Sequence, residues 1–167
     1  KDDAAKNVII PYLQKELGIR TTDYGLLTMD YFIATHPHAD HYGGFVTLME
    51  NKIFPKVVYD AGYPKSYPLY ETFLEMIKFA KYVVPTVGET VDLGGGVLMK
   101  FFGPISKYRG TKSDENNSSI VLKIIYGNVS FLFAGDVEIE AENDLVSWRG
   151  ELKSTILKIA HHGSKTS

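Results

Sequence analysis

The sequence predicts one domain that mixes α-helices and β-strands, as an α/β or α+β sandwich. Its 167 residues are close to the roughly 150 residues of an average domain. Hydrophobic residues make up 44% of the chain, so a core can form without cross-links. Segments with the apolar period of a helix alternate along the chain with short apolar segments that are typical of strands.

Helical patterns occupy several segments. The first begins with acidic residues and ends at Gly18. Pro11 argues against a regular helix there, because proline removes a backbone hydrogen bond. The apolar stripe that we predict for this helix consists of Val8, Ile9, Tyr12, Leu13 and Leu17. The predicted helices cover residues 3–18, 42–50, 69–81 and 137–148.

Short apolar segments bounded by turn residues predict the strands. Gly127-Asn128 separates two of them and is typical of a hairpin turn. Residues 103–117 form a polar loop, of a length that usually serves a function in a compact domain. The predicted strands cover residues 31–34, 57–59, 83–84, 90–93, 97–102, 119–126, 129–134 and 155–160.

Composition excludes several classes of function. Lys and Arg number 18 against 20 Asp and Glu, and a net charge of −2 argues against a strongly basic nucleic-acid coat. The chain has no cysteine, which excludes disulfides, cysteine-bound zinc and thiol catalysis. No apolar run approaches the roughly 18 residues of a membrane span, so we expect no membrane segment in this chain.

The five histidines fall into two short clusters, and this placement predicts a metal site. His36, His38 and His41 stand with Asp40 directly after a predicted strand, and His161-His162 directly follow the last one. Imidazole and carboxylate are the ligands that zinc and its first-row neighbours prefer. A solvated polar turn is the alternative for the first cluster.

A carboxylate also follows a third predicted strand, at Gly135-Asp136. By itself a Gly-Asp pair is more often a turn or a helix cap. Because three buried strands each end in a ligand-type residue, however, we expect them to share one metal-binding edge.

These motifs resemble those of the metallo-β-lactamase-fold hydrolases. The segments THPHADHYGG, NNSSIVLKIIYGNVSFLFAGDVE and LKIAHHGSKTS are similar to the hydrolase domain of ComEC-type DNA-uptake proteins and its stand-alone relatives. The resemblance implies an α+β fold, the four-layer αββα sandwich, for residues 1–167 as one domain. It also implies a domain truncated at both ends, since the family usually has further strands before and after this segment.

The resemblance assigns roles to the ligand-type residues. It implies two divalent metal ions, zinc or manganese. One ion would be bound by His36 and His38, the other by Asp40 and His41, with Asp136 bridging them and His162 as the last ligand. The catalytic residues would be Asp40, which also orients a water molecule, and His161, which contacts a phosphate or donates a proton. Which of His161 and His162 is the ligand stays open.

One departure from the family pattern concerns a further ligand histidine. No histidine lies between residues 42 and 160, and Asn116-Asn117 occupy about that place. One ion would then have only His36, His38, Asp136 and water, a ligand set that shifts the preference somewhat towards manganese. The expected substrate contacts are Asn116, Asn117, Ser164 and Lys165, together with Lys107 and Arg109 of the long loop.

The reaction implied is metal-assisted hydrolysis of a phosphodiester, with nucleic acid, DNA above all, as a transiently bound partner. A small-ester or phosphocholine-type esterase on the same fold is one alternative, and a non-catalytic metal-binding module is another. The resemblance implies a bacterial, extracytoplasmic or secreted protein, as part of a larger membrane protein or as a stand-alone relative. A cytoplasmic location stays open.

Overall fold

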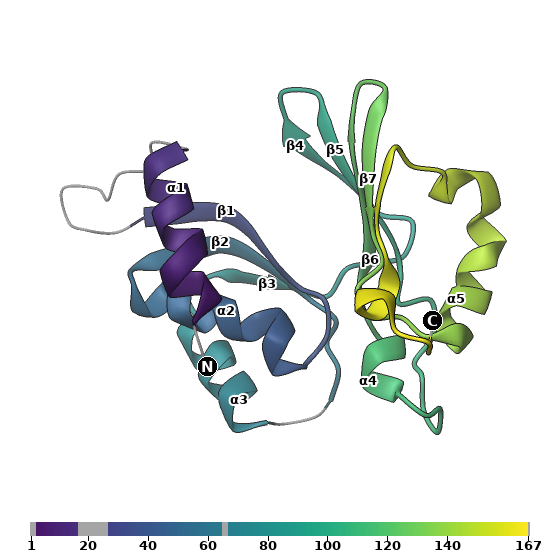
Figure 1. Ribbon diagram of the computed structural model, residues 1–167, viewed down its shortest axis with the longest axis horizontal. Coiled ribbons are helices and arrows are strands. Elements are labelled where there is room, and N and C mark those ends of the chain that lie inside the picture. Colours follow the sequence, from purple (N-terminus) through teal and green to yellow (C-terminus); the bar gives the residue numbers. More distant parts are fainter. Residues whose placement is uncertain (1–2, 17–26, 65–66, 167) are drawn as a thin grey trace. The chain divides into compact units, whose positions relative to one another are not determined.

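The computed structural model describes residues 3–16, 27–64 and 67–166 (Figure 1). The chain divides into two compact units. Unit 1 comprises residues 1–59 and 64–83, and unit 2 comprises residues 60–63 and 84–167. Each unit contains one β-sheet with its own helices, which confirms the predicted α+β class.

Unit 1 contains a three-stranded sheet in the order β1-β2-β3. Strands β2 and β3 run parallel, with Val57 opposite Lys81 and Tyr59 opposite Val83. The strands are β1 (Leu27–Ala34), β2 (Ile53–Asp60) and β3 (Lys81–Val83). The helices are α1 (Ile10–Glu16), α2 (Ala39–Glu50) and α3 (Pro68–Met76).

The first helix differs from the prediction in its buried face. A π-helical turn over Ala5–Ile9 precedes α1, and the Ile10 N–H donates to the carbonyl of Ala5, five residues back. This wide turn lies just before Pro11, where a regular helix would clash with the proline ring. The extra residue shifts the apolar phase, so Ala5, Ile10 and Leu13 are buried while Val8, Ile9 and Tyr12 of the predicted stripe are exposed. Residues 17 and 18, including the predicted stop at Gly18, lie outside the described residues.

The helix predicted over residues 69–81 is also shorter than expected. Helix α3 ends at Met76, and the chain turns before Lys81 pairs with β2. The amphipathic pattern did not indicate this end, because strand pairing with a distant segment determines the conformation of residues 81–83.

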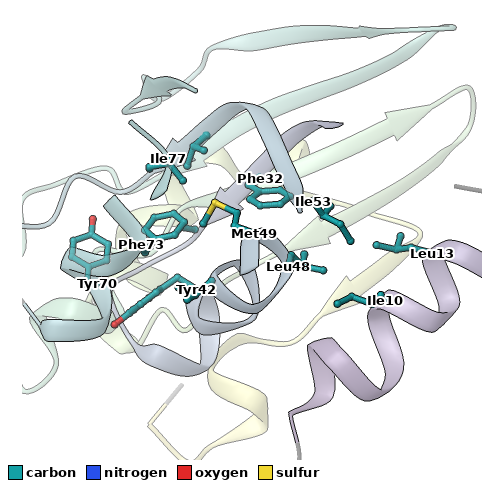
Figure 2. Close-up of a cluster of buried hydrophobic side chains, with 13 residues drawn as sticks. Ile10, Leu13, Phe32, Tyr42, Leu48, Met49, Ile53, Tyr70, Phe73 and Ile77 are labelled. Carbon is teal, nitrogen blue, oxygen red and sulfur yellow. The ribbon is translucent and has the colours of Figure 1, made fainter. Parts of the chain in front are cut away.

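The core of unit 1 lies between its sheet and its helices. Figure 2 shows Phe32 of β1, Met49 of α2 and Phe73 of α3 grouped together. The rings of Tyr42 and Phe73 lie 5.7 Å apart between centroids and join α2 to α3. This packing fixes the position of α2, whose first turn carries part of the histidine motif.

Unit 2 contains a five-stranded sheet in the order β4-β5-β6-β7-β8. Neighbouring strands are antiparallel except for β7 and β8, which run parallel with Phe131 opposite Ile156. The strands are β4 (Thr90–Gly94), β5 (Val97–Gly103), β6 (Val121–Tyr126), β7 (Val129–Phe133) and β8 (Ile156–Lys158). The helices are α4 (Asp114–Asn117), within the predicted long loop, and α5 (Ile139–Leu145), which a 3-10 segment (Val146–Leu152) continues.

Helix α5 packs against one face of this sheet (Figure 1). Ala141 and Leu145 of α5 join Phe102, Val121 and Leu132 of the sheet in a second buried cluster. Parallel pairing places the carboxyl ends of β7 and β8 side by side. The Gly135-Asp136 and His161-His162 motifs follow these two ends, so both lie in unit 2 at the same edge of its sheet.

The prediction that residues 1–167 form a single, truncated domain stays a prediction. Of the helices in the described ranges, none is both long and apolar enough to cross a membrane.

Candidate metal centre

The first histidine motif spans the end of β1 and the first turn of α2. Strand β1 ends at Ala34, and His38, with an extended backbone, precedes the helix as its N-cap. The His41 N–H donates to the His38 carbonyl at 2.9 Å and closes the first helical turn. The helix therefore begins at Ala39 and not at residue 42 as predicted, and it holds Asp40 on its first turn.

The side chains of this motif, with Thr35, form what we call the histidine cluster: Thr35, His36, His38, Asp40 and His41. Nε2 of His36 lies 3.0 Å from Nδ1 of His38. Nε2 of His41 lies 3.6 Å from Oδ2 of Asp40. His36 is fully buried, whereas 68% of the Asp40 side chain is exposed.

These distances fit a bound divalent ion. Two nitrogens bound to one tetrahedral zinc ion lie about 3.3 Å apart, given Zn–N bonds of about 2.0–2.1 Å. The His36 and His38 nitrogens are already close to that separation. Asp40 and His41 offer a carboxylate oxygen and a nitrogen, which is a second donor pair of the kind that zinc and manganese accept.

Thr35 is a member of this cluster that sequence reasoning missed. Its hydroxyl lies 3.2 Å from Nδ1 of His36 and 3.1 Å from Nδ1 of His41. The only sequence signal was its place directly before His36, because a contact with His41 depends on how the chain turns into α2.

In unit 2, Asp136 is held at the end of β7 by close packing. Its carboxylate is buried, and its backbone N–H donates to Oγ of Ser119 at 3.0 Å. Gly135 has a positive φ of 57°, and a Cβ there would lie 2.6 Å from Cβ of Ser119. Only glycine permits this approach, so the Gly135-Asp136 pair and Ser119 depend on each other.

Two cationic or potentially cationic side chains face the Asp136 carboxylate. Nζ of Lys158 donates to Oδ1 at 3.2 Å and to the carbonyl of Gly135 at 2.7 Å. Nε2 of His162 lies 3.3 Å from Oδ2. Lys158 was not among the predicted site residues, because its place on a strand gave no sign of this partner. For Asp136 to bridge two ions, the Lys158 ammonium would have to leave Oδ1.

His161 contacts a different carboxylate from His162. Its Nδ1 lies 3.3 Å from Oε1 of Glu138 and 2.7 Å from Oγ1 of Thr166. Both histidines have positive φ angles, 42° and 53°, which are costly for residues other than glycine. This turn directs the adjacent rings to separate carboxylates, so the structure gives His161 and His162 different surroundings. We call Asp136, Glu138, Lys158, His161 and His162 the aspartate cluster.

The neighbouring asparagines differ from each other. Nδ2 of Asn116 donates to Oε1 of Glu138 at 2.8 Å, while its buried Oδ1 accepts no hydrogen bond from the described residues. Oδ1 of Asn117 accepts the N–H groups of Glu138 and Ala141 at the start of α5, and its Nδ2 donates to Glu140 at 2.9 Å. These contacts favour a structural role for Asn117 as a helix cap.

The predicted basic contacts lie on exposed segments of unit 2. Lys107, Arg109 and Lys165 are exposed, and Ser164 is half-buried with Oγ 3.1 Å from the Thr166 hydroxyl. Between the two loop cations, Tyr108 is buried and donates to Oδ2 of Asp144 at 2.8 Å. Burial and this hydrogen bond raise the pKa of Tyr108 well above its ordinary value, so its hydroxyl stays neutral.

Each unit thus carries one cluster of ligand-type side chains. The histidine cluster brings together His36, His38, Asp40 and His41, and the aspartate cluster brings together Asp136 and His162. That the two clusters form a single dinuclear centre stays a prediction.

A comparison with known protein families matches residues 5–167 to the metallo-beta-lactamase superfamily. The chain belongs to the metallo-β-lactamase superfamily. Proteins of this superfamily are in general metal-dependent hydrolases, which agrees with the donor atoms in both clusters.

Relatives within the metallo-β-lactamase superfamily include competence proteins. ComE operon protein 3 of Bacillus subtilis is 29% identical over 97% of this chain and 20% of its own length. Competence protein ComA of Neisseria gonorrhoeae is 29% identical over 98% of this chain and 20% of its own length. Recombination protein 2 of Haemophilus influenzae is 31% identical over 95% of this chain and 17% of its own length. The chain thus spans a fifth or less of the length of these relatives.

The superfamily match confirms the metallo-β-lactamase fold predicted from the motifs, and the competence relatives confirm the resemblance to the ComEC-type branch. The number and identity of the metal ions, the residue roles and the substrate stay predictions.

Proposed function

We propose that this chain is a divalent-metal-dependent phosphodiesterase that cleaves DNA. The observation that carries the proposal is the 3.0 Å separation of Nε2 of His36 and Nδ1 of His38, since both nitrogens are positioned to bind one ion. Competence and recombination relatives support nucleic acid as the substrate, in preference to a small ester.

In this proposal the two clusters supply the ligands of two ions, zinc or manganese. His36 and His38 hold one ion, Asp40 and His41 hold the other, and Asp136 and His162 complete the centre from unit 2. When bound, the ions lower the pKa of a water molecule and stabilise negative charge on phosphate oxygens.

The remaining roles fall to the protein's own side chains. Asp40, exposed at the first turn of α2, accepts a hydrogen bond from the attacking water and orients it. His161, held through Nδ1 by Glu138, donates a proton to the leaving oxygen from Nε2. The exposed cations of Lys107, Arg109 and Lys165 bind phosphates of the substrate.

The test is cleavage of single-stranded DNA and of a chromogenic phosphodiester by the purified chain, with zinc or manganese and with a chelator. We expect metal-dependent turnover of both substrates, and loss of at least about 100-fold in His38→Ala and in Asp136→Ala. Asp30→Ala is the matched control, because Asp30 is an exposed carboxylate on β1 that pairs with Lys56.

Three outcomes contradict parts of the proposal. Equal turnover by His38→Ala and wild type would show that the assigned site is wrong. Turnover of the chromogenic ester alone would replace the nuclease with a small-ester hydrolase, of which a phosphocholine-type esterase is one form. Less than one equivalent of metal bound after zinc or manganese is added would favour a non-catalytic module.

We also propose an extracytoplasmic setting, in which this chain acts as the hydrolase part of a longer membrane protein. The match to competence relatives about five times as long as the chain supports a longer protein, and the resemblance to ComEC-type proteins implies the membrane setting. Nucleic acid would then be a transient partner, in keeping with the net charge of −2.

A further inference from the structure

The hydroxyl of Thr35 lies between two imidazoles of the histidine cluster. Oγ1 is 3.2 Å from Nδ1 of His36 and 3.1 Å from Nδ1 of His41, although His41 follows six residues later. The two rings lie 4.1 Å apart between centroids, tilted by 51°. One oxygen atom therefore contacts two rings from different segments, the residues that follow β1 and the first turn of α2.

Hydrogen-bond chemistry explains why a hydroxyl suits this position. A histidine that binds a metal through Nε2 carries its proton on Nδ1, and that N–H group needs an acceptor. A threonine hydroxyl has two lone pairs and can accept from two donors at once. A main-chain carbonyl or a carboxylate could also accept hydrogen bonds from the two Nδ1–H groups. The Thr35 hydroxyl provides this acceptor just after β1 ends, and it adds no charge.

We propose that Thr35 is a positioning residue for both His36 and His41, and that it couples the two metal ions. This inference rests on the proposed function, in which His36 belongs to one ion and His41 to the other. Because both Nδ1–H groups use the same oxygen, loss of that oxygen removes one contact from each ring, and both ions are then bound more weakly.

Nearby structure argues against a capping role for Thr35. The N-cap of helix α2 is His38, three residues after Thr35. Among the described residues, the Thr35 hydroxyl hydrogen-bonds to the imidazoles of His36 and His41. Thr35 is half-buried, and valine is branched at Cβ like threonine, so Thr35→Val removes the hydroxyl while keeping the shape of the side chain.

The test is a calorimetric titration of metal-free protein with Zn²⁺ and with Mn²⁺. We expect Thr35→Val to bind each of the two equivalents about 10- to 100-fold more weakly than wild type, the range typical of lost outer contacts to a ligand. Thr35→Ser keeps the hydroxyl and should bind within about 3-fold of wild type. Thr28→Val is the matched control, since Thr28 is an exposed threonine on β1, the strand that precedes Thr35.

A second readout follows the rings directly. In the metal-loaded protein, proton NMR should detect protected Nδ1–H signals for His36 and His41 in wild type and Thr35→Ser, and not in Thr35→Val. Circular dichroism spectra and thermal melting curves of the metal-free proteins establish that the variants fold. If Thr35→Val does not fold, Thr35→Ala takes its place.

The results separate the inference from the proposed function. If wild type and Thr35→Val bind both metal ions equally well, the proposed role of Thr35 is wrong, whereas the proposed metal site is unaffected. If Thr35→Val weakens the binding of only one of the two metal ions, Thr35 does not couple them. If wild type itself binds no metal, the proposed function fails, and the inference fails with it.

Discussion

Oε1 of Glu138 lies 3.3 Å from Nδ1 of His161 within unit 2. The same oxygen accepts a hydrogen bond from Nδ2 of Asn116 at 2.8 Å, and Glu138 is only 4% exposed. This buried carboxylate and the Thr166 hydroxyl, which lies 2.7 Å from the same nitrogen, orient the His161 ring. The His161 side chain is also less exposed than that of His162.

Glu138→Ala should therefore reduce turnover in a way that depends on the leaving group. If His161 protonates the leaving oxygen, we expect about 10- to 100-fold slower cleavage of DNA, whose alkoxide leaving group needs a proton. Cleavage of a p-nitrophenyl phosphodiester should change less than about 3-fold, because that leaving group departs without one. Steady-state rates on both substrates measure the difference.

Glu138→Gln is the control for shape, since its amide oxygen can still accept from His161 and Asn116. We expect it to retain more DNA cleavage than Glu138→Ala. An equal loss on both substrates would instead indicate that Glu138 only supports the fold.

Asn117→Ala should destabilise unit 2. Oδ1 of Asn117 accepts the N–H groups of Glu138 and Ala141, and the substitution leaves both donors at the start of α5 without this acceptor. We expect a loss of about 2 kcal/mol in the free energy of unfolding, the upper range for a helix cap. This corresponds to a fall in Tm of roughly 4–8 °C for a chain of this size.

Asn143→Ala is the matched control on the same helix, because Asn143 is exposed there. Its Tm should change by less than about 2 °C, since alanine also favours the helix. A Tm of Asn117→Ala equal to that of wild type would contradict the capping role and make Asn117 available for substrate again.

Much of the fold and the ligand set could be predicted from local patterns. The strands appeared as short apolar runs, and the ligand-type residues stood out because they follow strand ends. The features that the sequence did not predict depend on contacts with distant residues or on irregular turns. Pairing with β2 ends α3 early and makes residues 81–83 a strand. A wide turn before Pro11 moves Ile10 inward and Ile9 outward, which the regular helical period could not indicate.

The same reason explains the site residues that sequence reasoning missed. Lys158 contacts Asp136 because β7 and β8 pair in parallel, and the two residues are 22 positions apart. Glu138 lay within the predicted helix 137–148, and only the turn at His161 brings that imidazole to it. Local sequence identifies which residues carry chemistry, whereas strand register decides which of them meet.

Asp114 gives a prediction for acid pH. The Thr111 hydroxyl and the N–H groups of Gly110 and Thr111 donate to its carboxylate, and Arg109 adds a favourable charge. These contacts, the Thr111 hydroxyl first, hold the pKa of Asp114 below its ordinary value of 3.8. Because the folded-state pKa is lowered, the contribution to stability is present above pH 3.8 and is lost as pH falls through the folded-state pKa.

The measurement is Tm against pH for wild type and Asp114→Asn. We expect wild type to melt at a higher temperature near neutral pH and the gap to narrow below pH 3.8, where the wild-type carboxyl also becomes neutral. A gap that stays constant down to pH 2 would mean that the charge of Asp114 contributes nothing.

Gly135→Ala tests the close approach that holds Asp136. Gly135 has a φ of 57°, and a Cβ there would lie 2.6 Å from Cβ and 2.9 Å from Oγ of Ser119. Gly127 has nearly the same φ, 55°, with open space where its Cβ would be. Gly127→Ala therefore measures the backbone cost alone, about 1 kcal/mol, whereas Gly135→Ala should cost about 3 kcal/mol because Ser119 must also move.

Chemical denaturation of both variants gives the two free energies, and their difference isolates the contact with Ser119. Since Oγ of Ser119 accepts the Asp136 N–H, moving Ser119 should also displace the Asp136 carboxylate from Lys158 and His162. We therefore expect Gly135→Ala to lose metal affinity while Gly127→Ala keeps it. If the two variants lose equal stability and both bind metal normally, the glycine before Asp136 serves the turn alone and not the position of the carboxylate.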